Sequence, residues 1–374
     1  MKIAYLSSSI LPSRAANSVH VMKMSQAFSK NGHEVILYAP EREKGLEKDV
    51  DNVFDYYGVD DCFTLLKKPW VKVKGRGYIF GLLTALDMRG NDIDLAYGRK
   101  LSSCFFAALF GYPTIFESHS PIDSSNKMQS LLFKRMIKNK NFKRLVVISK
   151  ALKDYYLSNY DISDEEILVA HDGADLPEKL DESEHLQFDN NKFNVGYIGQ
   201  LYPGKGMEII AELVANCKWA NFHIIGGTKS DIDLWKSKLD EYNNITFYGY
   251  VPNGETEKYR QGFDVVLAPY QKEVSTFGGG GTNIAQWMSP LKIFEYMASG
   301  KAIVSSDLPV LREVLTDNEN ALLCDPDDVS SWIDSLKLLN ENDALRERLG
   351  ENAKKELISK YTWENRAEKV VSKL

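Results

Sequence analysis

Glu295 is the residue whose type and position most clearly indicate chemistry. It lies in the run Ser289–Gly300 (SPLKIFEYMASG), which predicts an apolar helix soon after the Gly-rich loop Phe277–Thr282. A helix N-terminus presents unpaired N–H groups and a partial positive charge, so it holds a phosphate well. A carboxylate in the first turn of that helix accepts two hydrogen bonds from vicinal sugar hydroxyls. A phosphate site beside a diol site predicts a nucleotide; the alternative is a capped amphipathic helix with a surface glutamate.

A second phosphate-binding pattern lies upstream, at Gly199–Gly206 (GQLYPGKG), between the strand pattern FNVGYI and a predicted helix. Its spacing is close to that of a P-loop, which predicts that Lys205 contacts a phosphate. A P-loop ATPase needs Ser or Thr directly after the lysine to hold magnesium, and this chain has Gly206, so we reject that activity. Neither half shows G-x-G-x-x-G after its first strand, which disfavours a nicotinamide enzyme.

Two D-x-D pairs invite a metal interpretation, Asp92/Asp94 and Asp231/Asp233. We expect the first to precede a strand and the second to lie in a helix, so neither is beside a nucleotide. Five histidines show no metal-ligand spacing and are interpreted as structural or exposed: His20, His33, His171, His185 and His223. The prediction is therefore that the protein needs no metal.

Short apolar runs alternate with amphipathic helical segments, which predicts parallel α/β sheets. The expected strands are 2–8, 34–39, 94–97, 114–117, 144–148 and 167–170, then 193–198, 221–225, 245–248, 265–268, 302–305 and 321–323. The acidic segment 176–192 is interpreted as a linker. The expected fold is two Rossmann-like α/β domains, 1–180 and 181–358, facing across a cleft. An amphipathic C-terminal helix in 359–374 is expected to pack back on the first domain.

Several helices are expected between the strands. Ser18 is the expected N-cap of the first helix and Asn31-Gly32 its C-terminal stop. Ligands of such folds lie at the carboxyl ends of strands, which is where the candidate loops occur.

The 374 residues suit two domains, and the four scattered cysteines without a CxxC pair are typical of reduced thiols in a cytoplasmic protein. The N-terminus is expected to be a strand and not a signal peptide, and no apolar stretch reaches the ~18 residues of a membrane span.

Charge is distributed unevenly along the chain. Residues 67–150 contain 16 Lys/Arg and 5 Asp/Glu, a local net charge of +11 in a protein of net charge −6. Two clusters, 67–78 and 133–144, interleave cations with Trp70, Tyr78, Phe133 and Phe142 in patterns that favour an anionic membrane surface. The alternatives are a solvated helix face or, less favoured for an acidic protein without a binding module, nucleic acid. We expect no nucleic-acid partner.

These motifs together resemble glycosyltransferase family 4. The strand–GQLYPGKG–helix unit and SPLKIFEYMASGKAIVSSDLP resemble the donor half of that family. VVISKALKDYY, VAHDGAD, ITFYGYVP and FDVVLAPY extend the resemblance over nearly the whole chain. It implies a GT-B fold and a retaining hexosyltransferase-type enzyme that uses a nucleotide-sugar as substrate, with no cofactor.

The resemblance implies a set of donor-binding residues. Lys205 matches a lysine that binds the donor diphosphate, and Glu295 matches the second glutamate of an E-x7-E motif, which holds the ribose. The family usually has arginine where this chain has Gln200, and its first glutamate falls at Trp287. The backbone of residues 288–291 is then expected to contact sugar and phosphate. The complete donor set is Gly199, Gln200, Gly204, Lys205, Met288, Ser289, Pro290, Leu291 and Glu295.

The first domain is expected to supply catalytic and acceptor residues. His119, in IFESHSP, matches a family histidine near the transferred sugar, and Glu117, on the same strand face, is expected to orient it. With Lys205, these two form the predicted catalytic set. The loop after the first strand and a strand-end arginine are predicted to lie near acceptor or phosphate: Arg14, Ala16, Asn17, Ser18 and Arg99.

The sequence thus predicts transfer of a sugar from a nucleotide-diphosphate donor to a hydroxyl acceptor, in the synthesis of a surface polysaccharide or lipid-linked saccharide. The enzyme is expected in the cytoplasm, peripheral on the inner face of the plasma membrane. Two alternatives stay open: a nucleotide-sugar 2-epimerase and a non-catalytic nucleotide-sugar binding protein.

Overall fold

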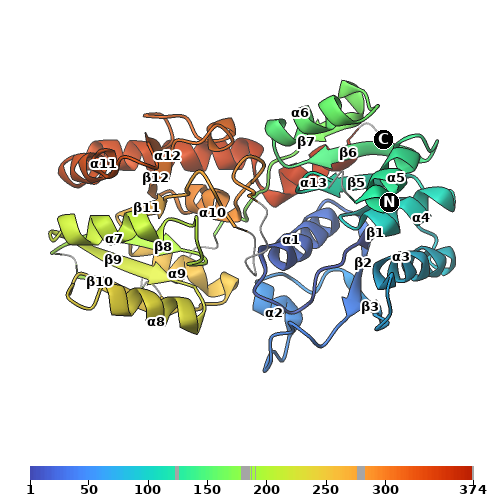
Figure 1. Cartoon of the computed structure of the whole chain (residues 1–374), viewed down its shortest axis with the longest axis horizontal. Coiled ribbons are helices and arrows are strands. Elements are labelled where there is room, and N and C mark those ends of the chain that lie inside the picture. The colour runs from blue at the N-terminus through green and yellow to red at the C-terminus, as the bar shows by residue number, and fades with distance from the viewer. Residues whose placement is uncertain (123–125, 178–185, 187, 190, 276–282, 373–374) are drawn as a thin grey trace. The chain divides into compact units, whose positions relative to one another are not determined.

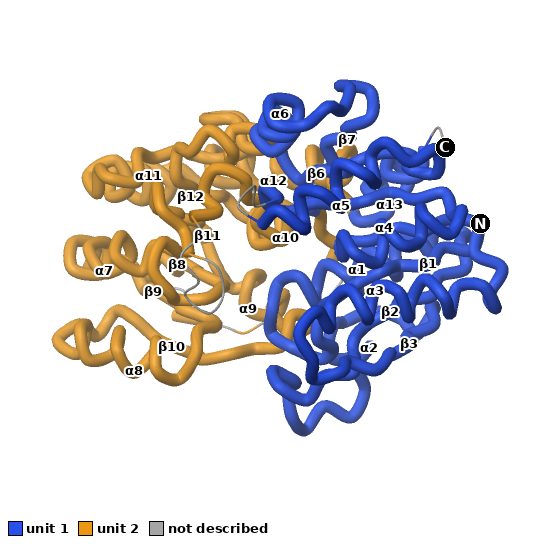
Figure 2. Tube along the Cα trace, turned by 45° about the vertical axis from the view of Figure 1, so that its right-hand side comes forward, with its two compact units in different colours: residues 1–172, 363–374 blue, residues 173–362 orange. Residues whose placement is uncertain are grey.

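The computed structural model describes residues 1–122, 126–177, 186, 188–189, 191–275 and 283–372. The chain forms two compact units (Figure 2): unit 1 is Met1–Asp172 with Trp363–Leu374, and unit 2 is Gly173–Thr362. The predicted domain boundary at residue 180, most of the predicted linker and the whole Gly-rich loop Phe277–Thr282 lie outside the described residues.

Unit 1 is built on a seven-stranded parallel sheet with the order β3-β2-β1-β4-β5-β6-β7 (Figure 1). The strands β1, β4 and β5 are buried along nearly their whole length, which requires that helices cover both faces of the sheet. The strands are β1 Lys2–Leu6, β2 Glu34–Glu41, β3 Thr64–Pro69, β4 Leu95–Gly98, β5 Thr114–Ser118, β6 Phe142–Val147 and β7 Ile167–Val169. The helices are α1 Ala16–Lys30, α2 Val53–Tyr57, α3 Arg76–Asp87, α4 Leu101–Leu109, α5 Lys127–Ile137, α6 Lys150–Asn159 and α13 Trp363–Val371.

Unit 2 contains a six-stranded parallel sheet with the order β10-β9-β8-β11-β12-β13. Its core joins apolar residues of the sheet to those of α7, α10, α11 and α12. The strands are β8 Phe193–Ile198, β9 Ala220–Ile225, β10 Ile245–Gly249, β11 Val265–Ala268, β12 Ala302–Ser306 and β13 Leu322–Cys324. The helices are α7 Met207–Asn216, α8 Lys229–Lys238, α9 Thr256–Gln261, α10 Leu291–Ser299, α11 Val329–Glu341 and α12 Asp343–Lys360.

The C-terminal helix α13 belongs to unit 1, as predicted, and packs against α1. Its buried residues Trp363, Ala367 and Val370 recur at intervals of three and four, which places them on one helical face. The Asn31 side chain at the end of α1 donates to the Glu364 backbone oxygen at 2.9 Å. The C-terminal segment therefore completes the first domain.

The start of α1 differs from the prediction. Ala15 is the N-cap, and Ser18 lies inside the helix, where its hydroxyl donates to the Ile10 backbone oxygen at 2.9 Å. The Ser18 N-cap prediction is therefore wrong, because this hydroxyl holds the loop before the helix and not the helix N-terminus. The predicted stop is confirmed: Asn31 is the C-cap, and Gly32 has a φ of +82°.

Both sheets reverse their strand order between two central strands, β1 and β4 in unit 1 and β8 and β11 in unit 2. Ligands of open parallel sheets bind outside the carboxyl ends of the strands at such points. We therefore expect the functional residues in the loops that follow these four strands and their neighbours. No described helix is both long and apolar enough to cross a membrane.

Candidate functional site

In unit 2 the loop after β8 has three glycines with positive φ: Gly199, Gly204 and Gly206. Gly204 has a φ of +86°, and a Cβ there would lie 2.1 Å from the Glu273 backbone oxygen. Gly199 has a φ of +156°, and a Cβ there would lie 2.7 Å from the Lys292 Nζ. Gly206 has a φ of +96°, and a Cβ would lie 2.0 Å from the Pro269 backbone oxygen. These contacts keep the backbone of the loop close to the end of β11 and to α10, as a loop that approaches a phosphate requires.

Lys205 presents a cation in this loop. Its ammonium lies 5.1 Å from the centroid of the Tyr270 ring and 5.3 Å from that of Tyr202. Burial lowers the pKa of Lys205 to about 8. The described residues form no salt bridge to Lys205, so two aromatic faces, and not a carboxylate, surround its charge.

Glu295 is the fifth residue of α10, so it lies in the second helical turn, and its predicted place in the first turn is wrong. One Glu295 oxygen accepts from the Asn253 Nδ2 at 2.7 Å, and the other lies 3.8 Å from an Arg260 nitrogen. The side chain is 17% exposed. Asn253 and Arg260 therefore fix the orientation of this carboxylate, whose remaining lone pairs are available to a ligand.

The N-terminus of α10 offers fewer backbone donors than predicted. Met288 N–H already donates to the Ile284 backbone oxygen at 3.0 Å, and Pro290 has no N–H. These two residues therefore do not supply such a donor. Leu291, the first residue of α10, remains at the positive end of the helix, and Ser289 lies buried beside it. Gln200 accepts a hydrogen bond from the Tyr197 hydroxyl through its backbone oxygen, at 2.7 Å.

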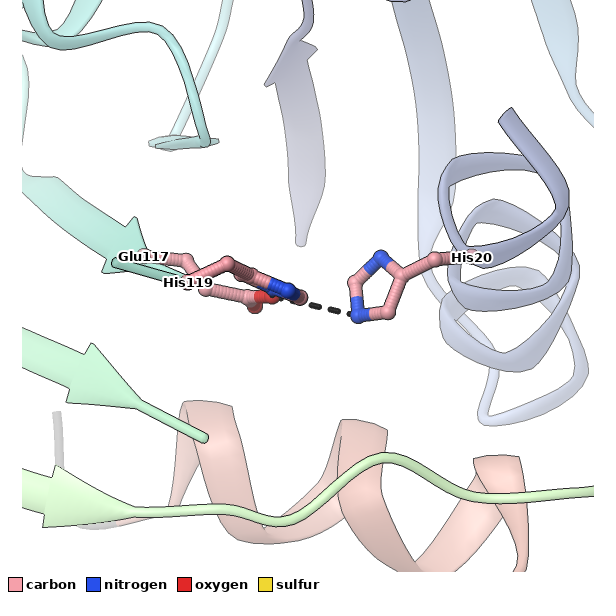
Figure 3. Close-up of side chains that lie close together, drawn as sticks. All are labelled: His20, Glu117 and His119. Atoms are coloured by element: carbon pink, nitrogen blue, oxygen red, sulfur yellow. Dashed lines mark hydrogen bonds and ion pairs between the residues drawn. The ribbon is translucent and has the colours of Figure 1, made fainter. Parts of the chain in front are cut away.

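In unit 1, residues of β5, α1 and α13 meet at the carboxyl end of β5, and Figure 3 draws three of them, Glu117, His119 and His20. Glu117, which is 1% exposed, accepts from the His119 Nε2 and lies 3.1 Å from the His20 Nε2 of α1. Arg366 of α13 contacts both Glu117 oxygens, at 3.1 and 3.2 Å. Burial opposes ionisation of Glu117, but Arg366 and then the histidines outweigh it and hold its pKa well below its usual range.

His119 is neutral at physiological pH. Burial, reinforced by the nearby Arg99 charge, lowers its pKa to about 4, although Glu117 acts in the opposite direction. Because Glu117 is ionised, the His119 Nε2 carries the proton that it donates to Glu117. The Nδ1 of this neutral ring is then a hydrogen-bond acceptor. The predicted pairing of Glu117 with His119 is therefore present in the structure.

Sequence reasoning missed the other members of this network, His20, Asp172 and Arg366. The His20 Nε2 lies 3.3 Å from an Asp172 oxygen, and its Nδ1 lies 3.4 Å from the Tyr5 hydroxyl. The Arg366 side chain also donates to the backbone oxygens of residues 170 and 171. These residues come from segments far apart in the sequence, so no local spacing signals them.

His20, Glu117 and His119 have the donor types of a metal site, and their candidate ligand atoms lie within 4.8 Å of one another. However, the Arg366 guanidinium already contacts both oxygens of Glu117 from a fully buried position. A divalent cation at Glu117 would face this fixed positive charge. The donor set therefore fits an arginine-paired carboxylate better than a metal, and the absence of a metal stays a prediction.

The predicted acceptor loop is only partly assembled at this site. Asn17 is exposed at the start of α1, and its backbone oxygen lies 3.5 Å from an Arg99 nitrogen. Arg14 pairs with Glu47 at 2.8 Å, and Ser18 is fully buried. Ala16, the first residue of α1, is exposed. Arg99 follows β4 and is close enough to His119 to lower its pKa, so Asn17 and Arg99 are brought to the His119 site.

Comparison with known proteins gives two consecutive family matches. Residues 18–178 match the model described as Glycosyltransferase Family 4, and residues 178–356 match the model described as Glycosyl transferases group 1. The chain belongs to glycosyltransferase family 4. The resemblance predicted from GQLYPGKG and SPLKIFEYMASG is thereby confirmed.

Individual relatives agree with this assignment. An uncharacterized glycosyltransferase of Methanocaldococcus jannaschii is 29% identical over 59% of this chain and 55% of its own length. A phosphatidyl-myo-inositol mannosyltransferase of Mycolicibacterium smegmatis is 28% identical over 43% of this chain and 39% of its own length. The chain thus spans little more than half, or less, of these curated relatives.

The solved structure of HepE from Anabaena in complex with UDP superposes with a TM-score of 0.71, at 13% identity. The match covers 99% of this chain and 98% of that chain. The predicted fold class is confirmed: the two parallel-sheet α/β units are those of a GT-B glycosyltransferase.

Proposed function

We propose that this protein is a retaining hexosyltransferase that transfers a sugar from a nucleotide-diphosphate donor to a hydroxyl acceptor. The observation that carries the proposal is a cation beside a carboxylate in unit 2. Lys205, in the loop after β8, has no carboxylate partner among the described residues. Glu295, in α10, is held by contacts with Asn253 and Arg260. A cation for a diphosphate and a carboxylate for a ribose diol are the two contacts that a nucleoside diphosphate needs. HepE, which shares the fold, was solved with UDP.

The reaction breaks the bond between the donor sugar's anomeric carbon and the diphosphate oxygen. Lys205 and the N-terminus of α10 stabilise the negative charge that develops on the departing diphosphate. The acceptor hydroxyl bonds to the same face of the anomeric carbon, and its proton passes to the leaving phosphate oxygen. This front-face route retains the anomeric configuration and needs no protein nucleophile.

His119 has the form required for a contact with the transferred sugar. It is neutral at physiological pH, and its Nε2–H is committed to Glu117. Its Nδ1 therefore accepts a hydrogen bond from a sugar hydroxyl without placing a positive charge beside an oxocarbenium-like centre. Arg99 and Asn17 lie close to this site and are proposed to bind the acceptor.

The test is thermal unfolding of the protein with UDP, GDP, ADP and CMP and their sugar conjugates, for wild type and Glu295→Ala. A ligand at a hundred times its dissociation constant stabilises by about 2.7 kcal/mol. We expect one nucleoside diphosphate to stabilise the wild type and to stabilise Glu295→Ala much less. Glu347→Ala, an exposed position on α12, is the matched control and should respond as the wild type does.

Product analysis then separates the possible activities. The sugar conjugate that binds is incubated with a panel of saccharide acceptors, and the product's anomeric configuration is read by NMR. Retention of the donor configuration supports the proposal. Inversion contradicts the retaining mechanism, and release of an epimerised sugar without acceptor identifies an epimerase. If no nucleotide stabilises the wild type, the donor site itself is refuted.

We further propose that the acceptor is presented at an anionic membrane, through α3 and the basic segments beside it. Ile79, Leu82, Leu83 and Leu86 recur at helical spacing along α3, and each is 36% to 40% exposed. Such an exposed apolar stripe flanked by the cations of 67–78 matches the surface of an anionic bilayer. The mycobacterial relative is named for a phosphatidyl-myo-inositol substrate. The protein would then act in the cytoplasm, on the inner face of the plasma membrane.

The second basic segment contributes charge and not apolar contact. Phe133 and Phe142, which the sequence suggested as membrane-facing aromatics, are core residues at 0% and 8% exposure. Lys134, Arg135 and Lys138 are exposed. Sedimentation with vesicles that contain either roughly 30 mol% phosphatidylglycerol or none tests this proposed membrane-binding surface. We expect Leu82→Ser/Leu86→Ser and Lys134→Glu/Arg135→Glu each to reduce sedimentation with anionic vesicles; unchanged binding refutes the surface.

A further inference from the structure

Lys292, the second residue of α10, turns its side chain into unit 2. The residue is 9% exposed, and its ammonium lies 3.7 Å from the centroid of the Tyr197 ring. Among the described residues, its Nζ has no hydrogen-bond partner. Burying an ammonium without an anion is costly, so a protein that keeps one there gains something other than stability.

The buried ammonium faces the loop that carries Lys205. A Cβ on Gly199 would lie only 2.7 Å from the Lys292 Nζ, so the Lys292 ammonium occupies the space beside this glycine. The ammonium groups of Lys205 and Lys292 each lie 5.1 Å from the centroid of the Tyr270 ring, so they are at most twice that distance apart. Both cations therefore lie beside the loop that follows β8.

Their electrostatics point to a missing anion. Burial lowers the pKa of Lys292 well below its usual range, the Lys205 charge lowers it further, and Glu295 only partly opposes them. A group that carries two negative charges would relieve both burial and repulsion at once. The loop itself offers one cation, because residue 200 is the neutral Gln200.

We propose that Lys292 is the second cation for the donor's diphosphate and acts together with Lys205. Lys292 reaches the loop from α10, and so supplies the charge that Gln200 lacks. This inference rests on the proposed donor site, and it names which part of the donor the residue recognises: the diphosphate and not the nucleoside.

Lys292→Met tests the inference, because methionine keeps the apolar stem and removes the charge. Dissociation constants for UDP and UMP, or for GDP and GMP if the guanine nucleotides bind, are measured by calorimetry. We expect the variant to bind the diphosphate 10- to 100-fold more weakly. Binding of the monophosphate should change far less, because a nucleoside contact is not involved.

Thermal unfolding without ligand provides a readout that a structural role would not give. Removing an unpaired buried charge should raise the midpoint of the ligand-free protein while the shift induced by diphosphate falls. Gln200→Arg in the Lys292→Met background should restore diphosphate binding by supplying the charge from the loop. This restoration separates lost charge from a damaged pocket.

The outcomes are distinct. If the wild type binds UDP and Lys292→Met binds it equally well, this inference is refuted and the donor site stands. If Lys292→Met loses affinity equally for UDP and UMP and its unfolding midpoint falls, Lys292 has a structural role, and the inference is again refuted. If the wild type binds no nucleotide, the proposed function fails, and the inference fails with it.

Discussion

The two units each bury charged groups at the end of a parallel sheet, but they balance those charges differently. In unit 1, Glu117 is surrounded by Arg366, His20 and His119. In unit 2, Lys205 and Lys292 lie over aromatic rings, with no salt bridge to either among the described residues. The first arrangement sets a carboxylate directly against an arginine, whereas among the described residues the two lysines of the second are only partly offset by Glu295.

This difference separates two uses of buried charge. A balanced network holds side chains in one geometry, since each charge fixes its partner and removing one member leaves the others uncompensated. An unbalanced pair lowers stability until a ligand of opposite charge binds. The network around Glu117 is therefore expected to position His119, and the lysine pair to bind the donor. Mutations should affect stability in unit 1 and affinity in unit 2.

The largest expected effect is on stability, from Arg366→Met. Arg366 is 2% exposed and contacts both Glu117 oxygens, so the variant leaves a buried carboxylate with only histidines to balance it. The free energy of unfolding should fall by about 3–5 kcal/mol, measured by urea denaturation. In the Arg366→Met/Glu117→Gln double variant, part of this loss should return. Lys355→Met, in an exposed pair on α12, should change little. A small effect at Arg366 would show that the network is not balanced as described.

Next in size is the loss of donor affinity in Lys205→Met. We expect nucleoside diphosphate binding to weaken about 100-fold, or roughly 2.7 kcal/mol, while the ligand-free protein unfolds at the same or a higher temperature. Calorimetry measures the affinity, and Lys229→Met, at an exposed lysine of α8, is the matched control. A variant that binds the nucleotide normally but unfolds more easily would place Lys205 with the structural charges of unit 1.

A smaller effect is the pH dependence of that affinity. Because the pKa of Lys205 is about 8, it loses its charge as the pH rises through 8. Affinity for the diphosphate should therefore fall about tenfold between pH 7 and pH 9, and Lys205→Arg should remove most of this fall. In the ligand-free protein the sign is opposite. Between pH 8 and 10.5 the unfolded state binds more protons at this lysine, so this group makes stability rise with pH. Flat affinity would contradict the lysine assignment.

The sheets could be predicted from the sequence wherever a buried strand reads as a continuous apolar run. Thr64–Pro69 (β3) was missed because this edge strand is half-buried and contains two lysines and a proline. The helix that follows, Arg76–Asp87 (α3), was missed because its apolar stripe is exposed and 67–78 was interpreted only as a basic cluster.

The two candidate sites also differ in how far the sequence alone predicts them. The donor residues of unit 2 lie in two short contiguous runs, so their spacing is visible in the sequence. The Glu117 network joins His20, Asp172 and Arg366 from remote segments, and only the fold brings them together. Lys292 lies inside a predicted run, but its importance comes from the direction of its side chain, which the sequence does not give.

The smallest expected effect concerns His119 and is a nearly flat response. A histidine with an ordinary pKa near 6.5 would lose about nine-tenths of its neutral form by pH 5.5, whereas the pKa of His119 is about 4. Titration of its ring protons by NMR, assigned with a His119→Gln variant, should show no midpoint between pH 5.5 and 7.5. The titration of His119 should change the rate of sugar transfer less than about twofold over that range.

In ligand-free protein, the unfolded state binds more protons at His119 than the folded state between pH 6.5 and 4. The free energy of unfolding should therefore fall as the pH falls through that window. A midpoint near 6.5 would mean that burial and the Arg99 charge do not keep His119 neutral, and would break the contrast between the charge network of unit 1 and the lysine pair of unit 2.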